Sequence, residues 1–339
     1  MALEVLLLSI CFVMDPSIIE AFGTPTSHNI PHSESNVVHE IQKIRGKVVL
    51  NKSGAVQTVD LFRTNATDDL VMQISHLREI EELNLCQTRV TDISIKKLAN
   101  LTKLRALCLL ETGITDKSVR YLVKMKRLEA LHLGSTAVSD QVFSALRQMK
   151  NLRDLNLMNT HITDSGCIHL KELNKLQRLS LAYTVISDNT LHRIFEFKEL
   201  VSLDLRGTSV TKRSLCQLKT MAKLEELYLP ECTSDSVLSS MKNMPNLRNL
   251  WLAQTNISDK GIKNLQSLPK LEWLVLRNTN ITDVGLKHLE KTKSLKVVDI
   301  GKTNTSFKGI RSLRLALPEL KVTGKEKVKK KKKERKNTK

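Results

Sequence analysis

The chain has 339 residues, 41% of them hydrophobic but only 4% aromatic, so its core must consist mainly of Leu, Ile and Val. Its 54 Lys and Arg against 35 Asp and Glu give a net charge of +19, and its six cysteines include no CxxC pair. This composition excludes a cysteine-ligated zinc site and a disulfide-rich miniprotein, and it favours a repeat protein. We expect the cysteines to pack as small buried hydrophobic residues.

Residues 1–39 are expected to be a poorly ordered leader. Within them, residues 2–14 form an apolar run that only Glu4 interrupts. The run is too short to span a membrane but has the length of a signal-peptide core, and Ala21 and Gly23 offer small residues at a cleavage position. No Lys or Arg precedes it. Two alternatives stay open: the protein is exported to the cell envelope if residues 1–23 are a signal peptide, and cytoplasmic otherwise.

From residue 56 onward the sequence repeats with a period of 24 residues. Two copies read LRDLNLMNTHITDSGCIHLKELNK (152–175) and LEWLVLRNTNITDVGLKHLEKTKS (271–294), and the shared pattern is LxxLxLxxTxITDxGLxxLxxLxx. The repeats start at Val56, Ile80, Leu104, Leu128, Leu152, Leu176, Leu200, Leu224, Leu247, Leu271 and Leu295, with a last start at Leu320. A pattern held through eleven copies predicts a solenoid of stacked units.

Each column of the repeat predicts one structural role. The alternating apolar residues at its start indicate a short strand with one face inward. The Thr that follows, for example Thr160, can satisfy backbone groups of the turn. Thr163–Asp164 and its equivalents are N-cap residues of a short helix. Glycines such as Gly166 near the helix start favour close approach between neighbouring units.

We therefore expect an α/β fold, a single right-handed solenoid over residues 40–322 with eleven strand–turn–helix units and a terminal strand near Leu320. The unit that begins at Val56 and the irregular unit 295–317 are expected to cap the core. The repeat that begins at Leu224 lacks one residue near Cys232, where we expect a local kink.

The repeat pattern resembles the leucine-rich-repeat family, in particular the 24-residue TxITDxGL type common in bacterial, notably planctomycete, proteins. The entry segment from Ile41 through Gly46 to the Val59-Asp60-Leu61 run resembles the opening of those proteins. The unit is also similar, more distantly, to the repeats of F-box proteins, which recruit ubiquitination substrates. Thr replaces the Cys of that pattern here, and residues 1–55 show no three-helix F-box. The resemblance implies a horseshoe with a concave parallel sheet, convex helices and a non-enzymatic role.

In such a solenoid, residues at the third, fifth, seventh and eighth places of each repeat are expected to point into solvent on the concave face. Four of the five Trp and Tyr residues occupy these places. Trp251 and Trp273, on neighbouring strands, are expected to lie within about 8 Å of each other. Exposed aromatic residues flanked by Arg are typical of interaction hot spots. The candidate partner-binding residues are Tyr183, Arg206, Tyr228, Trp251, Trp273 and Arg277.

Other chemistry has little support in the sequence. His132 on the concave face has no second ligand nearby in the columns, which argues against a metal site. Carboxylates such as Asp154 and Glu226 are expected to be solvated members of a mixed-charge surface. We find no Ser/His/Asp arrangement and no Gly-rich phosphate loop. The sequence thus predicts no enzyme, no cofactor, no metal and no small-molecule substrate.

Residues 323–339 are expected to be a disordered lysine-rich tail, because residues 325–339 carry ten basic and two acidic side chains without apolar periodicity. Such a tail can attract nucleic acid, anionic lipid or acidic polymers, or it can solubilise the chain without a dedicated partner. The residues concerned are Lys329, Lys330, Lys331, Lys332, Lys333, Arg335 and Lys336.

The leading hypothesis is a non-catalytic interaction scaffold that binds a protein or peptide on its concave face. The alternatives are weak attachment to nucleic acid or an anionic surface through the tail, and F-box-like substrate recruitment. Acidic residues of the concave face, among them Asp154, Asp204, Glu226 and Glu231, argue against a nucleic-acid groove there.

Overall fold

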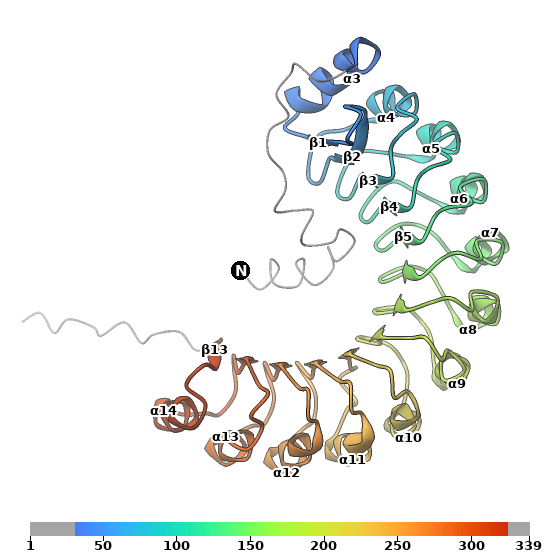
Figure 1. Cartoon of the computed structure of the whole chain (residues 1–339). Coiled ribbons are helices and arrows are strands. Elements are labelled where there is room, and N and C mark those ends of the chain that lie inside the picture. The colour runs from blue at the N-terminus through green and yellow to red at the C-terminus, as the bar shows by residue number, and fades with distance from the viewer. Residues whose placement is uncertain (1–30, 325–339) are drawn as a thin grey trace, which may run out of the picture.

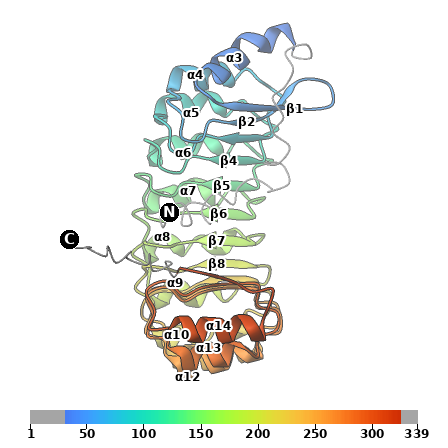
Figure 2. The same cartoon turned by 90° about the vertical axis from the view of Figure 1, so that its left-hand side faces the viewer.

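The computed structural model describes residues 31–324, which form one curved solenoid. A 13-stranded sheet lines the concave side and the helices lie along the convex side (Figure 1). In Figure 2 the strands from β1 to β8 follow one another in chain order, and this order continues along the sheet to β13. The α/β solenoid expected from the repeat is confirmed.

The sheet is built from very short strands. Each repeat contributes one, and only β1 and β2 exceed three residues. The strands are β1 (Lys47–Leu50), β2 (Val56–Asp60), β3 (Glu82–Asn84), β4 (Ala106–Cys108), β5 (Ala130–His132), β6 (Asp154–Asn156), β7 (Arg178–Ser180), β8 (Ser202–Asp204), β9 (Glu226–Tyr228), β10 (Asn249–Trp251), β11 (Trp273–Val275), β12 (Val297–Asp299) and β13 (Lys321–Thr323).

The convex side carries short α-helices and 3₁₀ turns. The α-helices are α3 (His32–Lys43), α4 (Asp68–Ile74), α5 (Asp92–Leu98), α6 (Asp116–Leu122), α7 (Phe143–Leu146), α8 (Asp164–Cys167), α9 (Asp188–Ile194), α10 (Lys212–Leu215), α11 (Asp235–Ser240), α12 (Asp259–Ile262), α13 (Asp283–Leu289) and α14 (Phe307–Ala316). The 3₁₀ helices are η2 (Asp140–Val142), η3 (Leu170–Glu172), η4 (Leu218–Thr220), η5 (Met241–Asn243) and η6 (Lys263–Ser267). None of the helices described is long and apolar enough to cross a membrane.

The register of the sheet follows the repeat. From β2 to β13 the strands are parallel, and equivalent residues stand opposite each other, as Leu155 does between Leu131 and Leu179. These leucines are buried in one hydrophobic core that runs the length of the solenoid. β1 alone pairs antiparallel with β2. Residues at the same position of successive repeats therefore lie next to one another in a row along the solenoid.

Neighbouring repeats are joined by aspartates at the helix starts. A Thr or Ser side chain caps most of the repeat helices as expected, for example Thr163 at α8 and Ser187 at α9. The Asp that follows it reaches the next repeat, where it accepts hydrogen bonds from the backbone N–H and hydroxyl of that repeat's Thr or Ser. We call this contact an aspartate link. The links join Asp68 to Thr91, Asp92 to Thr115, Asp116 to Ser139, Asp140 to Thr163, Asp164 to Ser187, Asp188 to Thr211, Asp235 to Ser258, Asp259 to Thr282 and Asp283 to Ser306.

The recurring glycine column has the same origin. A Cβ added to Gly166 would collide with the carboxylate of Asp140, and one added to Gly285 with that of Asp259. Glycine at this position therefore leaves room for the aspartate link of the preceding repeat, which gives a physical reason for the close approach expected there.

One junction lacks the link. Lys212 stands where the aspartate is usual, and the next repeat is the one that is a residue short. The sheet nevertheless crosses this junction in register, with Asp204 opposite Tyr228 and Tyr228 opposite Trp251. The missing residue is absorbed in the turn, where Thr233 is buried and its hydroxyl has no hydrogen-bond partner.

The N-terminal boundary differs from the expectation of a leader up to residue 39. α3 begins at His32, and Val38 and Ile41 on it are buried against the first repeat. Glu34 accepts a hydrogen bond from the Val56 N–H at 2.9 Å. The ordered cap is thus a helix and the β1 strand ahead of the Val56 unit. Residues 1–30 and 325–339, with the expected signal segment and nearly all of the lysine-rich tail, lie outside the described residues.

Candidate functional site

The candidate partner-binding residues lie on or just after strands β7 to β11. Arg206 is their centre. Its Nε and Nη2 donate to Asp204 at 2.9 and 2.6 Å, and its guanidinium lies 5.0 Å from the ring centre of Tyr228 and 5.1 Å from that of Trp251. The two rings are 5.9 Å apart. Because these residues occupy neighbouring strands, the register alone brings Asp204, Tyr228 and Trp251 side by side.

Arg206 is held in an almost buried position, with only 5% of its surface exposed. Burial lowers the pKa of its guanidinium, but the charge and hydrogen bonds of Asp204 outweigh this, so the pKa is raised overall. Burial, with the nearby carboxylates of Glu226 and Asp204, also raises the pKa of the Tyr228 hydroxyl. Arg206 is therefore a fixed cation and Tyr228 a neutral ring. The Nη1 atom of Arg206 is buried and has no hydrogen-bond partner among the described residues.

Two exposed aromatic rings flank this centre. Trp273 is 47% exposed and stands opposite Asn249, so it lies two residues away in register from Trp251, as expected. No ring contact between the two tryptophans occurs in the described residues, because Trp251 faces Tyr228 instead. Tyr183 is 41% exposed in the turn after β7, and its ring lies against Gly207. We call Tyr183, Arg206, Tyr228, Trp251 and Trp273 the aromatic cluster.

The sixth candidate, Arg277, is placed apart from Arg206. Its Nε and Nη2 donate to Asp299 on β12 at 3.1 and 3.0 Å, and its guanidinium lies against Gly301. The structure gives Arg277 a local ion-pair partner and no contact with the aromatic cluster.

The expectation that the seventh column points into solvent is wrong for much of the sheet. Cys86, Leu110, Met158 and Ala182 are buried, and with Cys108 they form a second small apolar cluster beside the main core. The physical reason is the turn. The residue at the eighth place adopts a left-handed conformation, as in Glu111 with φ of 53°, so the seventh side chains of adjacent repeats stack on one another.

The cysteines also depart from the expectation of simple packing. Cys86 and Cys108, in adjacent repeats, form a disulfide with their Cα atoms 5.5 Å apart. Cys232 is free and exposed. Cys167 behaves as expected: it is buried in the core, and burial raises the pKa of its thiol to about 12.

Next to the aromatic cluster lies a polar hollow that the sequence did not reveal. Buried His132 bonds through Nε2 to Asp154 at 3.1 Å, and Arg178 donates to Glu226 at 2.8 Å across the intervening strand. The hollow, of about 60 Å³, is lined by His132, Asp154, Asn156, Met158, Arg178, Leu179, Ser180, Ser202, Asp204, Glu226 and Tyr228. Asp154 is thus hydrogen-bonded and Glu226 ion-paired, rather than simply solvated. His132, Asp154, Arg178 and Glu226 all belong to the third and fifth columns of the repeat. Which of them contact each other is shown only by the register of the strands.

The arrangement offers stacking surfaces and hydrogen-bonding groups. No group of three or more His, Cys, Asp or Glu that could hold a metal ion occurs between residues 31 and 324. What the site can do chemically is recognise another molecule through exposed rings next to a fixed cation and a polar hollow.

Comparisons with known proteins agree on the architecture. Residues 148–171 match the Leucine Rich repeat family model. The fold is a leucine-rich-repeat solenoid. An internalin of Listeria monocytogenes, which is 18% identical, has a similar structure with a TM-score of 0.54 over 86% of this chain and 94% of its own. No curated protein matches the chain.

Two further leucine-rich-repeat structures are more distant. A Leptospira interrogans protein of this kind is 19% identical over 74% of each chain with a TM-score of 0.48. A plant peptide hormone receptor in complex with its peptide RGF2 is 16% identical over 81% of this chain and 51% of its own, with a TM-score of 0.45.

Proposed function

We propose that the protein is a non-catalytic scaffold that binds a protein or peptide partner on its concave face through the aromatic cluster. The observation that carries the proposal is a buried, fixed Arg206 that contacts Tyr228 and Trp251, with the exposed ring of Tyr183 on the β7 side of this group and that of Trp273 on the β11 side. When a partner binds, the apolar surface of exposed Trp and Tyr side chains is removed from water, which stabilises the complex. Trp, Tyr and Arg side chains dominate the binding energy of many interfaces.

The polar hollow supports the same proposal. It runs from β5 to β9, Tyr228 belongs to both the hollow and the aromatic cluster, and Asp204 in the hollow holds Arg206 of the cluster. A partner that covers the rings of Trp273 and Tyr183 would extend over the polar groups of the hollow. These groups can form hydrogen bonds with the backbone or side chains of the partner. Interfaces of this kind combine an aromatic centre with a polar rim.

The test compares two double variants of the full chain. Tyr183→Ala/Trp273→Ala removes the exposed rings of the cluster, while Phe307→Ala/Leu315→Ala removes two exposed apolar side chains of α14. Both are compared with the unchanged protein in affinity capture from source-cell lysate, with quantification of each captured protein. We expect the first variant to bind one specific partner with an affinity that is lower by about 30-fold or more, because two hot-spot side chains are removed. The α14 variant should keep it.

Retention of every captured protein by the Tyr183→Ala/Trp273→Ala variant would contradict the proposal, provided thermal melting shows that the variant is folded. Equal loss in both double variants would also contradict it, because binding would then not depend on the concave rings.

A further inference from the structure

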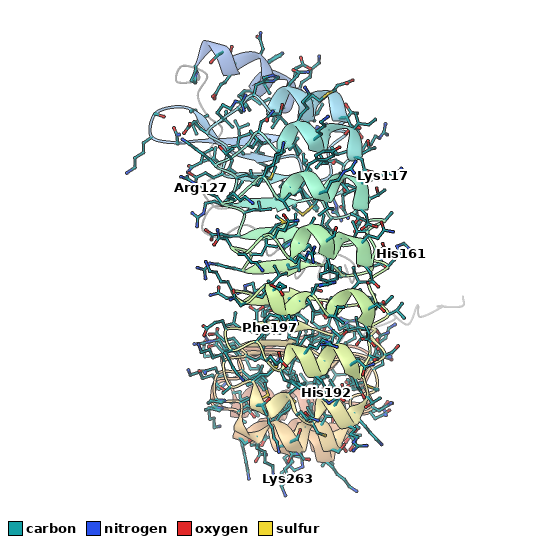
Figure 3. All side chains as sticks on the ribbon, turned by 90° about the vertical axis from the view of Figure 1, so that its right-hand side faces the viewer. Lys117, Arg127, His161, His192, Phe197 and Lys263 are labelled. Carbon is teal, nitrogen blue, oxygen red and sulfur yellow. A yellow bond between two sulfur atoms is a disulfide. The ribbon has the colours of Figure 1, made fainter. Side chains whose placement is uncertain are left out.

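The convex face carries a dense group of unpaired cations on α5, on α6 and in the turn after α6. The group consists of Lys96, Lys97, Lys117, Arg120, Lys124, Lys126 and Arg127, all of them exposed. We call it the convex basic patch. In Figure 3, Lys117 and Arg127 lie at opposite edges of the convex face, so the patch spans its width. Neighbouring helices α5 and α6 pack directly against each other.

Carboxylates near the patch are already committed elsewhere. Asp92 and Asp116 form aspartate links to Thr115 and Ser139. Glu79 is paired with Lys103 at 2.6 Å and Glu129 with Arg105 at 3.2 Å. No residue of the patch takes part in an ion pair within residues 31–324. The seven cations of the patch therefore lack direct ion-pair partners among these residues, and Asp92 and Asp116 on the same helices offset only part of their charge.

Tyr121 lies within the patch and orients two of its cations. The guanidinium of Arg120 is 5.1 Å from the ring centre of Tyr121, and the Lys96 ammonium is 6.0 Å from it. The Nη2 of Arg120 also donates to the Tyr121 hydroxyl at 3.3 Å. This is the one Tyr that lies away from the concave columns. An aromatic ring among exposed cations is typical of surfaces that bind nucleic acid.

The same face is compensated farther along the chain. Lys150 pairs with Glu172 and Lys223 with Glu199, both at 2.8 Å. The concave face is also mixed in charge, with the ion pairs of Arg206, Arg178 and Arg277. A group of cations without ion-pair partners is thus a property of particular convex helices rather than of the whole surface.

We propose that the convex basic patch binds the phosphate backbone of nucleic acid without sequence preference, on the opposite face from the partner-binding cluster. Duplex nucleic acid presents a phosphate about every 3.4 Å along each strand, so a patch two helices wide, roughly 20 Å, meets several phosphates at once. An anionic membrane fits less well. Membrane-binding helices insert an apolar face, and Ile93 is the single large apolar residue exposed on α5 and α6.

The test uses the full chain, tail included, and a fluorescein-labelled 20-base-pair duplex of random sequence. Anisotropy titrations from about 50 to 200 mM salt compare three triple variants with the unchanged protein. Lys117→Gln/Arg120→Gln/Lys124→Gln removes three cations of the patch. Lys150→Gln/Lys198→Gln/Lys223→Gln is the matched control from the compensated region. Lys263→Gln/Lys287→Gln/Arg311→Gln, the α12–α14 variant, removes three cations from another basic stretch, which runs from η6 directly after α12 through α13 to α14.

We expect the patch variant to bind the duplex about tenfold more weakly at 50 mM salt. The slope of the logarithm of the binding constant against the logarithm of the salt concentration should become shallower by about three, one for each phosphate that no longer contacts a cation. The control variant should bind like the unchanged protein. Three results would overturn the proposal: no duplex binding by the unchanged protein, equal binding by the patch and control variants, or a weakening confined to the α12–α14 variant. Binding to phosphatidylserine vesicles but not to the duplex would overturn it in favour of a membrane. Thermal melting of each variant separates these results from misfolding, and none depends on the aromatic cluster.

Discussion

Two junctions of the solenoid stack the same leucine layers in different ways. Between α8 and α9, Asp164 accepts hydrogen bonds from the Ser187 N–H, the Ser187 hydroxyl and the Thr190 hydroxyl. Between α10 and α11, Lys212 replaces the aspartate and Ser234 has no such acceptor. The sheet is in register at both. Strand pairing and leucine packing therefore suffice to align the repeats, and the aspartate links add their hydrogen bonds on the helical side.

Removal of a link should have the largest effect. Asp164→Ala leaves the fully buried Thr190 hydroxyl and the Ser187 N–H without their acceptor, so we expect a loss of about 3 kcal/mol in the free energy of unfolding. Urea denaturation of the full chain measures it. Asp69→Ala, at an exposed position on the first turn of α4, is the control and should change stability by less than about 0.5 kcal/mol. Equal losses for the two variants would show that the links contribute little.

Acid should weaken the three junctions that are linked by Asp68, Asp164 and Asp188. Burial alone would raise the pKa of Asp68, Asp164 and Asp188, but the hydrogen bonds that they accept outweigh it and lower each pKa below its usual value. A group of this kind stabilises the fold above its unfolded pKa of about 4, and that stability is lost as the pH falls through the lower folded pKa.

The measurement is urea unfolding at about pH 7 and at successive values below about 4. We expect the unchanged protein to lose more stability over this range than Asp164→Asn, which has no charge to lose at that link. Parallel pH profiles for the two proteins would argue against a contribution from Asp164.

The unlinked junction should gain stability from a single change in its shortened turn. Thr233 occupies the apolar column filled by Ile257 in the next repeat, and its buried hydroxyl has no partner. Thr233→Val keeps the shape and removes the unsatisfied group, so we expect a gain of about 1 kcal/mol. Thr255→Val is the matched control. It should cost about 1 kcal/mol because the Thr255 hydroxyl donates to the Leu252 carbonyl. Destabilisation by both changes would mean that the Thr233 hydroxyl is satisfied in solution.

Restoring the missing carboxylate should have the smallest effect. Lys212→Asp offers Ser234 an acceptor, but the turn before Ser234 is one residue short, so the geometry of the other links is only partly available. We expect a gain below about 1 kcal/mol and slower amide hydrogen exchange in α11. Lys219→Asp, which makes the same change of charge on η4, should leave exchange in α11 unchanged. A gain as large as the loss in Asp164→Ala would show that the shortened turn imposes no constraint.

The features that repeat along the chain were predictable from the sequence. The period gave the strands, the short helices and the core, and the turn role of the Thr column is confirmed by the Thr160 hydroxyl, which donates to the Leu157 carbonyl. The glycine at position 166 was expected to mark a close approach, and its neighbour is Asp140. Such features are the same at nearly every junction, so they can be predicted from a single repeat that is stacked between two identical copies.

Contacts between unlike residues in adjacent repeats were not predictable in the same way. The rings of Tyr228 and Trp251 were expected on the concave face, but their contact with Arg206 depends on the path of a left-handed turn that periodicity does not encode. The disulfide between Cys86 and Cys108 has the same origin. The spacing of the cysteines along the chain gives no indication of this disulfide. Cys86 is at the seventh place of its repeat and Cys108 at the fifth place of the next, and these places are close together only because of the path of the turn.

The uniform register has a consequence for how such a molecule can grow. If residues 152–175 were duplicated in tandem, Asp164 of the first copy would face Thr163 of the second, and Asp164 of the second copy would face Ser187 as it does now. The aspartate link at the new junction would be of a type that already exists elsewhere in the chain. The concave face would lengthen by one strand spacing, about 4.8 Å, without any change to the core. Duplication of single repeats could thus set the distance between two recognition points on this face, in fixed steps.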